Sequence, residues 1–145
     1  MSIDRSGKWW KGTAPEDIAG FLTAYADEGY EVAAFRLARC ACGSVEFKLD
    51  ADDDEGAARR TCTRCGTAHF ICDSDDAWEE AEPESWTCVE CTSDRANVGC
   101  GFSLRDGGDV RWIYVGVRCA SCGVLGCFAG WGIDYGPSGH LLDEV

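Results

Sequence analysis

Apolar residues near the start of the chain recur with the period of a helix. Thr13 and Glu16 have the spacing of a capping box, Pro15 suits a first helical turn, and Gly29 suits a helix end. Between them runs one apolar stripe with members at i, i+3, i+4 and i+7, namely Ile18, Phe21, Leu22 and Tyr25. The pattern predicts an N-terminal helix that packs on a core, with docking to a partner as the alternative role.

After this helix the apolar period changes to two, which is typical of strands. Residues 31–39 predict a strand that leads to Cys40, and Val45, Phe47 and Leu49 alternate with charged residues in the next one. Residues 98–104 and 110–117 also alternate, and the Asp-Gly-Gly-Asp sequence at 106–109 predicts a hairpin turn between them. A last apolar stretch covers residues 124–135. The predicted fold class is mainly β with one N-terminal helix.

A run of acidic residues without a single base lies between Asp73 and Glu84. Because like charges resist collapse, we interpret residues 77–87 as an acidic linker. The parts before and after it repeat in the same order: a cysteine pair, a strand containing Phe-x-Leu, a turn, a strand, and Cys-x-x-Cys-Gly. This predicts four regions. They are a helix and strand packed on the rest (1–37), a first cysteine-bearing half (38–76), the linker (77–87), and a second half with a C-terminal tail (88–145).

Cysteine usage dominates the composition, with eleven in 145 residues. The first residues show no secretory signal, and no stretch approaches the length of a membrane span. We therefore expect a cytoplasmic protein with no membrane contact, in which thiols stay reduced and bind metal instead of forming disulfides. The formal net charge is −13, which argues against nucleic acid as a partner because phosphate binding needs a surplus of Lys and Arg.

Eight of the cysteines form four close pairs: Cys40 and Cys42, Cys62 and Cys65, Cys88 and Cys91, Cys119 and Cys122. Glycine follows three of the pairs, as suits a knuckle turn with positive φ. These motifs resemble those of zinc-ribbon proteins with rubredoxin-like knuckles, over residues 38–135. The chain departs from that pattern at two points, since Cys40-Ala41-Cys42 is one residue short and Thr92 replaces a glycine.

The resemblance implies two tandem zinc ribbons and two structural Zn²⁺ ions, one held by the first four of these cysteines and one by the last four. Shorter loops favour pairing within each half. A cross-braced arrangement stays open, as does iron. Cys72, Cys100 and Cys127 read as small buried hydrophobic residues, and His69 and His140 as residues without a metal.

The sequence lacks the motifs of a catalytic site. Four-cysteine sites leave no open metal position, and neither a deaminase signature nor a hydrolase elbow is present. We therefore expect no enzyme but a protein-interaction module that binds a basic protein, as an immunity-type inhibitor or a regulatory subunit. An iron- or thiol-based redox protein and a nucleic-acid-binding ribbon are the alternatives. The predicted partner surface is in and beside the acidic linker, with aromatic anchors among acids: Trp78, Glu79, Glu80, Glu82 and Trp86.

Overall fold

The computed structural model describes residues 3–26 and 29–145 of the chain. Its helices are α1 (Asp17–Tyr25) and α2 (Ser74–Ala77), with 3₁₀ turns η1 (Trp78–Glu80) and η2 (Gly139–Asp143). Its strands are β1 (Ile3–Asp4), β2 (Lys11–Gly12), β3 (Ala34–Leu37), β4 (Phe47–Asp52), β5 (Ala57–Cys62), β6 (Ala68–Phe70), β7 (Glu84–Ser85), β8 (Ala96–Leu104), β9 (Val110–Cys119) and β10 (Leu125–Gly132). The protein is mainly β, as predicted.

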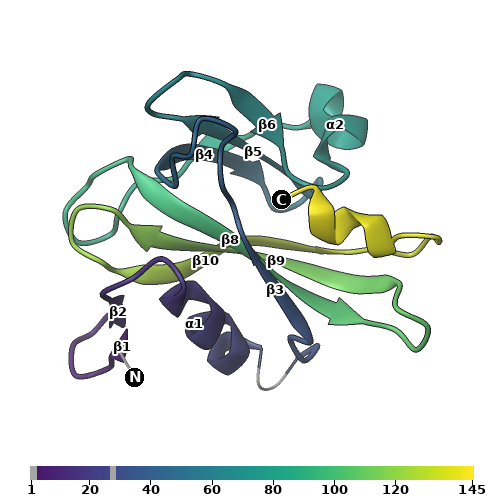
Figure 1. Cartoon of the computed structure of the whole chain (residues 1–145), viewed down its shortest axis with the longest axis horizontal. Helices are drawn as coiled ribbons and strands as arrows, with labels where there is room; N and C mark the ends of the chain where they lie inside the picture. The colour runs from purple at the N-terminus through teal and green to yellow at the C-terminus, as the bar shows by residue number, and fades with distance from the viewer. Residues whose placement is uncertain (1–2, 27–28) are drawn as a thin grey trace.

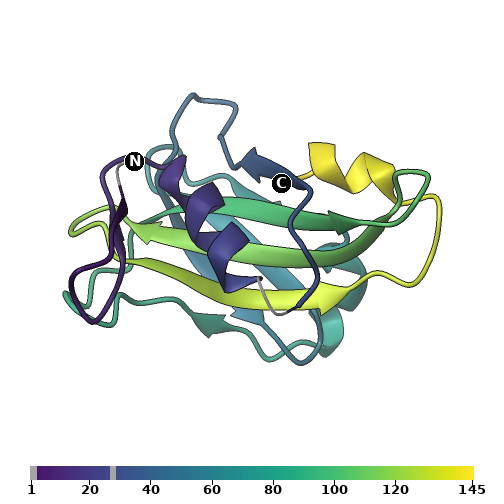
Figure 2. The same ribbon diagram turned by 90° about the horizontal axis from the view of Figure 1, so that it is seen from below.

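One antiparallel sheet runs through most of the molecule in the order β10-β9-β8-β4-β5-β6. One edge of β8 pairs with β9, and the opposite edge has two partners. β3 pairs there with Gly99–Phe102, and β4 pairs with β8 through Phe47 and Ala96. From that junction the sheet folds over, so that β4 and β5 cross behind β8, β9 and β10 while α1 covers the other face (Figure 2). Three layers result.

The alternation predicted for the strands sorts their side chains between these layers. In β4, Phe47, Leu49 and Ala51 are buried while Lys48 is exposed. The alternate β8 residues Val98, Cys100 and Phe102 belong to the core cluster shared with β4 and β5, and are fully buried. The hairpin turn between β8 and β9 is also present, with Gly107 and Gly108 both at φ +95°. The main core therefore lies between β4 and β5 on one side and β8 and β9 on the other.

Helix α1 packs closely against glycine residues of strands β8 and β9. Its stripe residues Ile18 and Leu22 are fully buried, whereas Tyr25 is 58% exposed. A Cβ atom added to Gly116 would lie 2.6 Å from a methyl of Ile18, and one on Gly101 would lie 3.3 Å from Leu22. The absence of these side chains lets the helix touch the sheet backbone.

The predicted capping box at the start of α1 is wrong. Glu16 occupies the N-cap position with no side-chain cap bond. Instead the Asp17 carboxylate accepts the backbone N–H groups of Thr13 and Ala14, at 2.8 and 3.1 Å. A carboxylate one residue further along reaches the same loop amides, and its negative charge suits the helix N-terminus.

The acidic segment follows a defined path over the outer part of the sheet. Its first residues form α2 and η1, and β7 pairs with β4 through Ser85–Asp50 and Glu84–Ala51. α2 lies on the opposite side of the molecule from α1 (Figure 1). The division into two halves joined by a linker stays a prediction. No helix in the described part of the chain combines the length and apolar character needed to cross a bilayer.

Candidate metal centres

The four cysteine pairs sit on knuckles with a common backbone design. In the Cys62 knuckle, the Gly66 N–H donates to the Cys62 carbonyl (3.0 Å) and the Cys62 N–H donates to the Thr67 carbonyl (2.9 Å). The same two bonds recur from Cys88 to Thr92 and Ser93, and from Cys119 to Gly123 and Val124. Each turn thereby holds two thiols on the same side of a rigid loop.

The two departures from the ribbon pattern fit this design in different ways. The shorter Cys40 knuckle closes one residue earlier, with the Gly43 N–H on the Cys40 carbonyl at 2.8 Å. Thr92 takes the glycine position with φ +62°, close to the +77° of Gly66 and the +86° of Gly123. Thr92 is β-branched, so this backbone conformation is strained there.

The knuckles bring the eight predicted cysteines into two groups of four, as pairing within each half requires. In the first group the Cys40 and Cys65 sulfurs are 3.4 Å apart, and those of Cys42 and Cys62 are 3.6 Å apart. In the second group the sulfurs of Cys88 and Cys122, and of Cys91 and Cys119, are each 3.5 Å apart.

These sulfur separations fit a tetrahedral metal ion. A zinc–sulfur bond of about 2.3 Å gives a tetrahedron whose edges are about 3.8 Å, while a disulfide requires about 2.05 Å. All four sulfurs of each group lie within 4.8 Å of one another. Each group can therefore hold one metal ion with four thiolate ligands.

Backbone N–H groups favour ionisation of at least one thiol in each group. The N–H of Cys65, with that of Arg64, lowers the pKa of Cys62 to about 6. Burial opposes ionisation of Cys119, but the N–H groups of Cys122 and Ser121 lower its pKa to about 7. Burial, followed by the neighbouring thiols, raises the pKa of Cys122 to about 12. Four adjacent thiolates repel one another, and a bound dication removes that repulsion.

One row of paired residues joins the two centres across the sheet. Cys62 in β5 pairs with Phe47, Phe47 pairs with Ala96, and Ala96 pairs with Cys119 in β9. Phe47 and Ala96 are fully buried. The two ligand cysteines are thus separated by three strand spacings, about 14 Å.

The N-terminal segment fastens onto the second centre. The Gly12 N–H donates to the Gly123 carbonyl at 2.8 Å, and Lys11 forms an ion pair with Glu90, also at 2.8 Å. The Arg118 Nε–H donates to the Gly12 carbonyl at 2.8 Å. These contacts place residues 11–12 against both knuckles of this centre.

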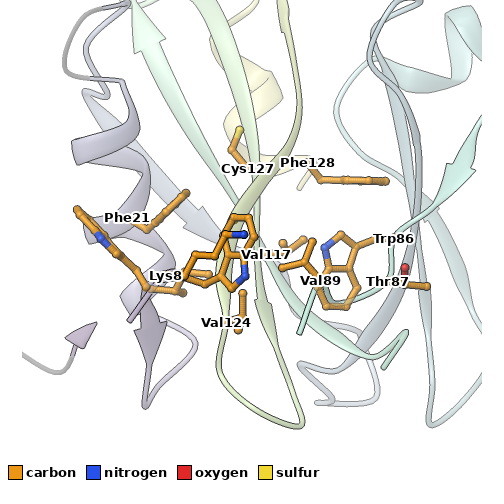
Figure 3. Close-up of a pocket in the computed structure, with 13 residues that line it drawn as sticks. Lys8, Phe21, Trp86, Thr87, Val89, Val117, Val124, Cys127 and Phe128 are labelled. Atoms are coloured by element: carbon orange, nitrogen blue, oxygen red, sulfur yellow. The ribbon is translucent and has the colours of Figure 1, made fainter. Parts of the chain in front are cut away.

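A hollow of about 480 Å³ opens beside the same centre (Figure 3). Trp9 and Trp10 belong to its lining. Phe21 lies on one side of the hollow, and Trp86 and Val89 lie on the other (Figure 3). Trp9 is 39% exposed. Sequence reasoning missed this hollow, although the number of tryptophans was its signal.

The other three cysteines lie outside both groups. Cys100 is fully buried in the main core and Cys72 nearly so, and the Cys72 thiol donates to the Leu141 carbonyl at 3.3 Å. Burial raises the pKa of Cys127 to about 12. His69 is also outside, with Nε2 3.0 Å from the Glu144 carbonyl oxygen.

The residues predicted to bind a partner have different environments. Glu79, Glu80 and Glu82 are exposed. Trp78 is half-buried between the ring of Phe70 and the guanidinium of Arg59, the latter 4.8 Å from its ring centre.

Trp86, predicted as an aromatic anchor of the partner surface, is buried. It is 7% exposed and belongs to the main core. The physical reason is that the backbone N–H of Trp86 donates to the Leu49 carbonyl at 2.8 Å, which extends the pairing of β7 with β4 and places the indole inside the fold.

Comparison of the chain with protein-family models, with curated proteins and with solved structures found no significant match.

Proposed function

We propose that this chain is a non-catalytic, zinc-binding interaction module built from two tandem zinc ribbons, and that it binds a basic protein. Cys40, Cys42, Cys62 and Cys65 would hold one Zn²⁺ ion, and Cys88, Cys91, Cys119 and Cys122 the other. The partner would be the target of an immunity-type inhibitor or the larger subunit of an enzyme that this chain regulates.

The order of parts supports tandem ribbons. Each group of four cysteines takes one knuckle before a hairpin and one knuckle after it, β4–β5 in the first case and β8–β9 in the second. Four thiolates complete the tetrahedral coordination of zinc, so no position stays open for a substrate. The metal in such a site contributes its binding energy to folding.

The observation that carries the partner proposal is the meeting of two acidic segments. The turn after β4 contains Asp53, Asp54 and Glu55, all exposed. The Glu82 N–H donates to the carboxylate of Asp52, 30 residues away in the chain, at 2.9 Å, so the segment from 79 to 84 lies beside this turn. We call the exposed acids of residues 53–55 and 79–84 the acidic face.

Electrostatics favours a basic protein on this face. Each filled centre adds two net negative charges, which takes the formal −13 to about −17. Such a field repels the phosphates of nucleic acids and accelerates encounters with basic proteins. The attraction weakens as salt shortens the Debye length from about 10 Å at 0.1 M to about 3 Å at 1 M.

Affinity capture from cell extract, followed by binding kinetics with the purified partner, tests the proposal. Changing Glu79, Glu80 and Glu82 together to Gln should slow association at low salt and flatten its salt dependence. A control that removes three charges elsewhere, Glu16→Gln, Glu31→Gln and Asp106→Asn, should slow association less. Capture of nucleic acid alone, or equal effects of both triple variants, would refute the acidic face.

Metal analysis tests the ribbons separately from the partner. Protein purified without added metal should contain about two zinc ions per chain. Iron in place of zinc, visible as thiolate-to-iron absorption, would favour the redox alternative. One ion per chain would contradict the two-site arrangement.

A further inference from the structure

A second hollow, distinct from the one beside the metal centre, lies at the end of the acidic face. It has a volume of about 460 Å³, and its lining combines four aromatic rings with two carboxylates: Tyr25, Trp112, Tyr114, Phe128, Asp53 and Asp54. It is bounded by the end of α1, by β9 and β10, and by the turn after β4.

The aromatic rings form a connected wall. Tyr25 and Tyr114 meet edge to face with ring centres 6.0 Å apart, and Trp112 lies 6.4 Å from Tyr114. The Tyr114 hydroxyl donates to the Tyr30 carbonyl at 2.8 Å, which fixes its ring. Tyr25, by contrast, is largely exposed and presents its ring to solvent at the edge of the hollow.

A bulge in β10 shapes the opposite side. The pairing of β10 with β9 shifts between Cys127 and Ala129, so Phe128 is the extra residue. Bulges redirect side chains in this way beside binding sites. Phe128 lines both this hollow and the one at the second metal centre.

The carboxylates of Asp53 and Asp54 lie at the hollow without a basic side chain of the described residues paired to them. Asp53 accepts the Gly130 N–H at 2.8 Å, which ties the acidic turn to β10. Neither Asp53 nor Asp54 takes part in an ion pair within the described ranges 3–26 and 29–145. The charge of the hollow is therefore negative.

The rings of the hollow also differ from other aromatic rings of the protein. Arg5 stacks on Trp10, Lys8 lies over Trp9 and Arg59 lies over Trp78. In the part of the chain that the structure describes, no cation of the protein itself lies over Tyr25, Trp112, Tyr114 or Phe128. Phe21 stacks on Tyr25 at 6.1 Å and Tyr30 lies 5.6 Å from Trp112, so other rings of the protein already occupy part of this aromatic surface. The surface that lines the hollow carries no cation of the described residues.

We propose that this hollow receives the guanidinium group of an arginine from the basic partner, an inference that rests on the proposed function. A guanidinium is planar and can stack on an aromatic ring while it donates hydrogen bonds to a carboxylate. The acidic face would attract the partner, and the hollow would fix one of its arginines.

The test uses two eight-residue peptides, one of alternating arginine and glycine and one with lysine in place of arginine, added to the zinc-loaded protein. Binding is followed by NMR through the backbone amides and the Trp112 indole N–H. Tyr25→Leu should raise the Kd of the arginine peptide about 2- to 5-fold, the range of an exposed cation–π contact. Asp54→Asn should raise it by up to about 5-fold, the range of an exposed ion pair. Tyr25→Phe keeps the ring and should change the Kd less than 2-fold.

The outcomes separate this inference from the proposed function. Shifts at Tyr25, Trp112 and residues 53–54, with weaker binding of the lysine peptide, support the hollow. Shifts confined to residues 79–84, or equal losses in Tyr25→Leu and Tyr25→Phe, overturn the hollow and leave the acidic face standing. Failure of both peptides to bind contradicts both. Tyr25 and Asp54 have exposed side chains, and unchanged melting temperatures will show that the variants at these two positions fold.

Discussion

Thr92 offers a sharp test of the knuckle design, because it occupies a glycine position without being glycine. We expect Thr92→Gly to stabilise the protein. The threonine side chain is exposed, and its hydroxyl donates to the neighbouring Cys91 carbonyl at 2.6 Å. Water can replace that bond at the surface, so the substitution removes little besides the backbone strain at φ +62°.

The magnitude follows from two opposing terms. A residue other than glycine loses about 1–2 kcal/mol in the left-handed region, and β-branching puts threonine at the upper end. Glycine loses more conformational entropy on folding, which costs about 0.5–1 kcal/mol. The net gain should be about 1 kcal/mol, or a rise of about 3 °C in Tm for a chain of this size.

Urea denaturation at a fixed, buffered concentration of free zinc measures this gain as a higher midpoint with an unchanged slope. The matched control is Gly66→Thr, the reverse substitution in the first centre. Gly66 has φ +77° and open space around the position of its missing Cβ, so only the backbone term applies there. It should lose about 1 kcal/mol. If Thr92→Gly gains nothing while Gly66→Thr loses nothing, the positive φ is not a source of strain and the reasoning fails.

Three further variants test the core, one of them at a cysteine that lies outside both groups. Cys100→Ala should keep full zinc content by elemental analysis while lowering stability by roughly 1–2 kcal/mol, since it removes a buried thiol from the core and no ligand; loss of an ion would contradict the two groups. Gly116→Ala should cost about 1–3 kcal/mol in urea denaturation through its clash with Ile18, and an unchanged midpoint would show that α1 is packed less closely than described. Asn97→Ala should cost about 1–3 kcal/mol, because Asn97 is buried and donates to the Val45 carbonyl at 2.8 Å; a loss below 0.5 kcal/mol would mean that water satisfies that carbonyl.

The sequence predicted best where a repeating pattern had a single physical cause. The alternation around Phe47 and the glycine turn at 107–108 led to the right strands, because each reflects local burial and backbone conformation. The cysteine pairs indicated which residues would meet, since the closely spaced thiols of a knuckle converge and short loops favour neighbours.

Prediction failed where long-range pairing decided the outcome. β7 has two residues, too few for an alternation of apolar and polar positions to predict a strand. The acidic residues around it also favoured a prediction of solvent exposure. Its pairing with β4 buries Trp86 and brings Glu82 beside Asp52. Neither the acidic face nor the aromatic hollow exists in the linear sequence, because each is assembled from segments that tertiary structure brings together.

The row of paired residues between Cys62 and Cys119 affects how the protein takes up metal. Binding of the first ion orders one end of this row, including Phe47 and Ala96. Binding of the second ion then has a smaller conformational-entropy cost, because these residues are already ordered. The second ion should therefore bind more tightly than the first, and half-loaded molecules should be scarce at every metal concentration. A cell short of the metal would then hold a mixture of fully loaded and empty chains, and the amount of loaded protein would respond steeply to the free metal concentration.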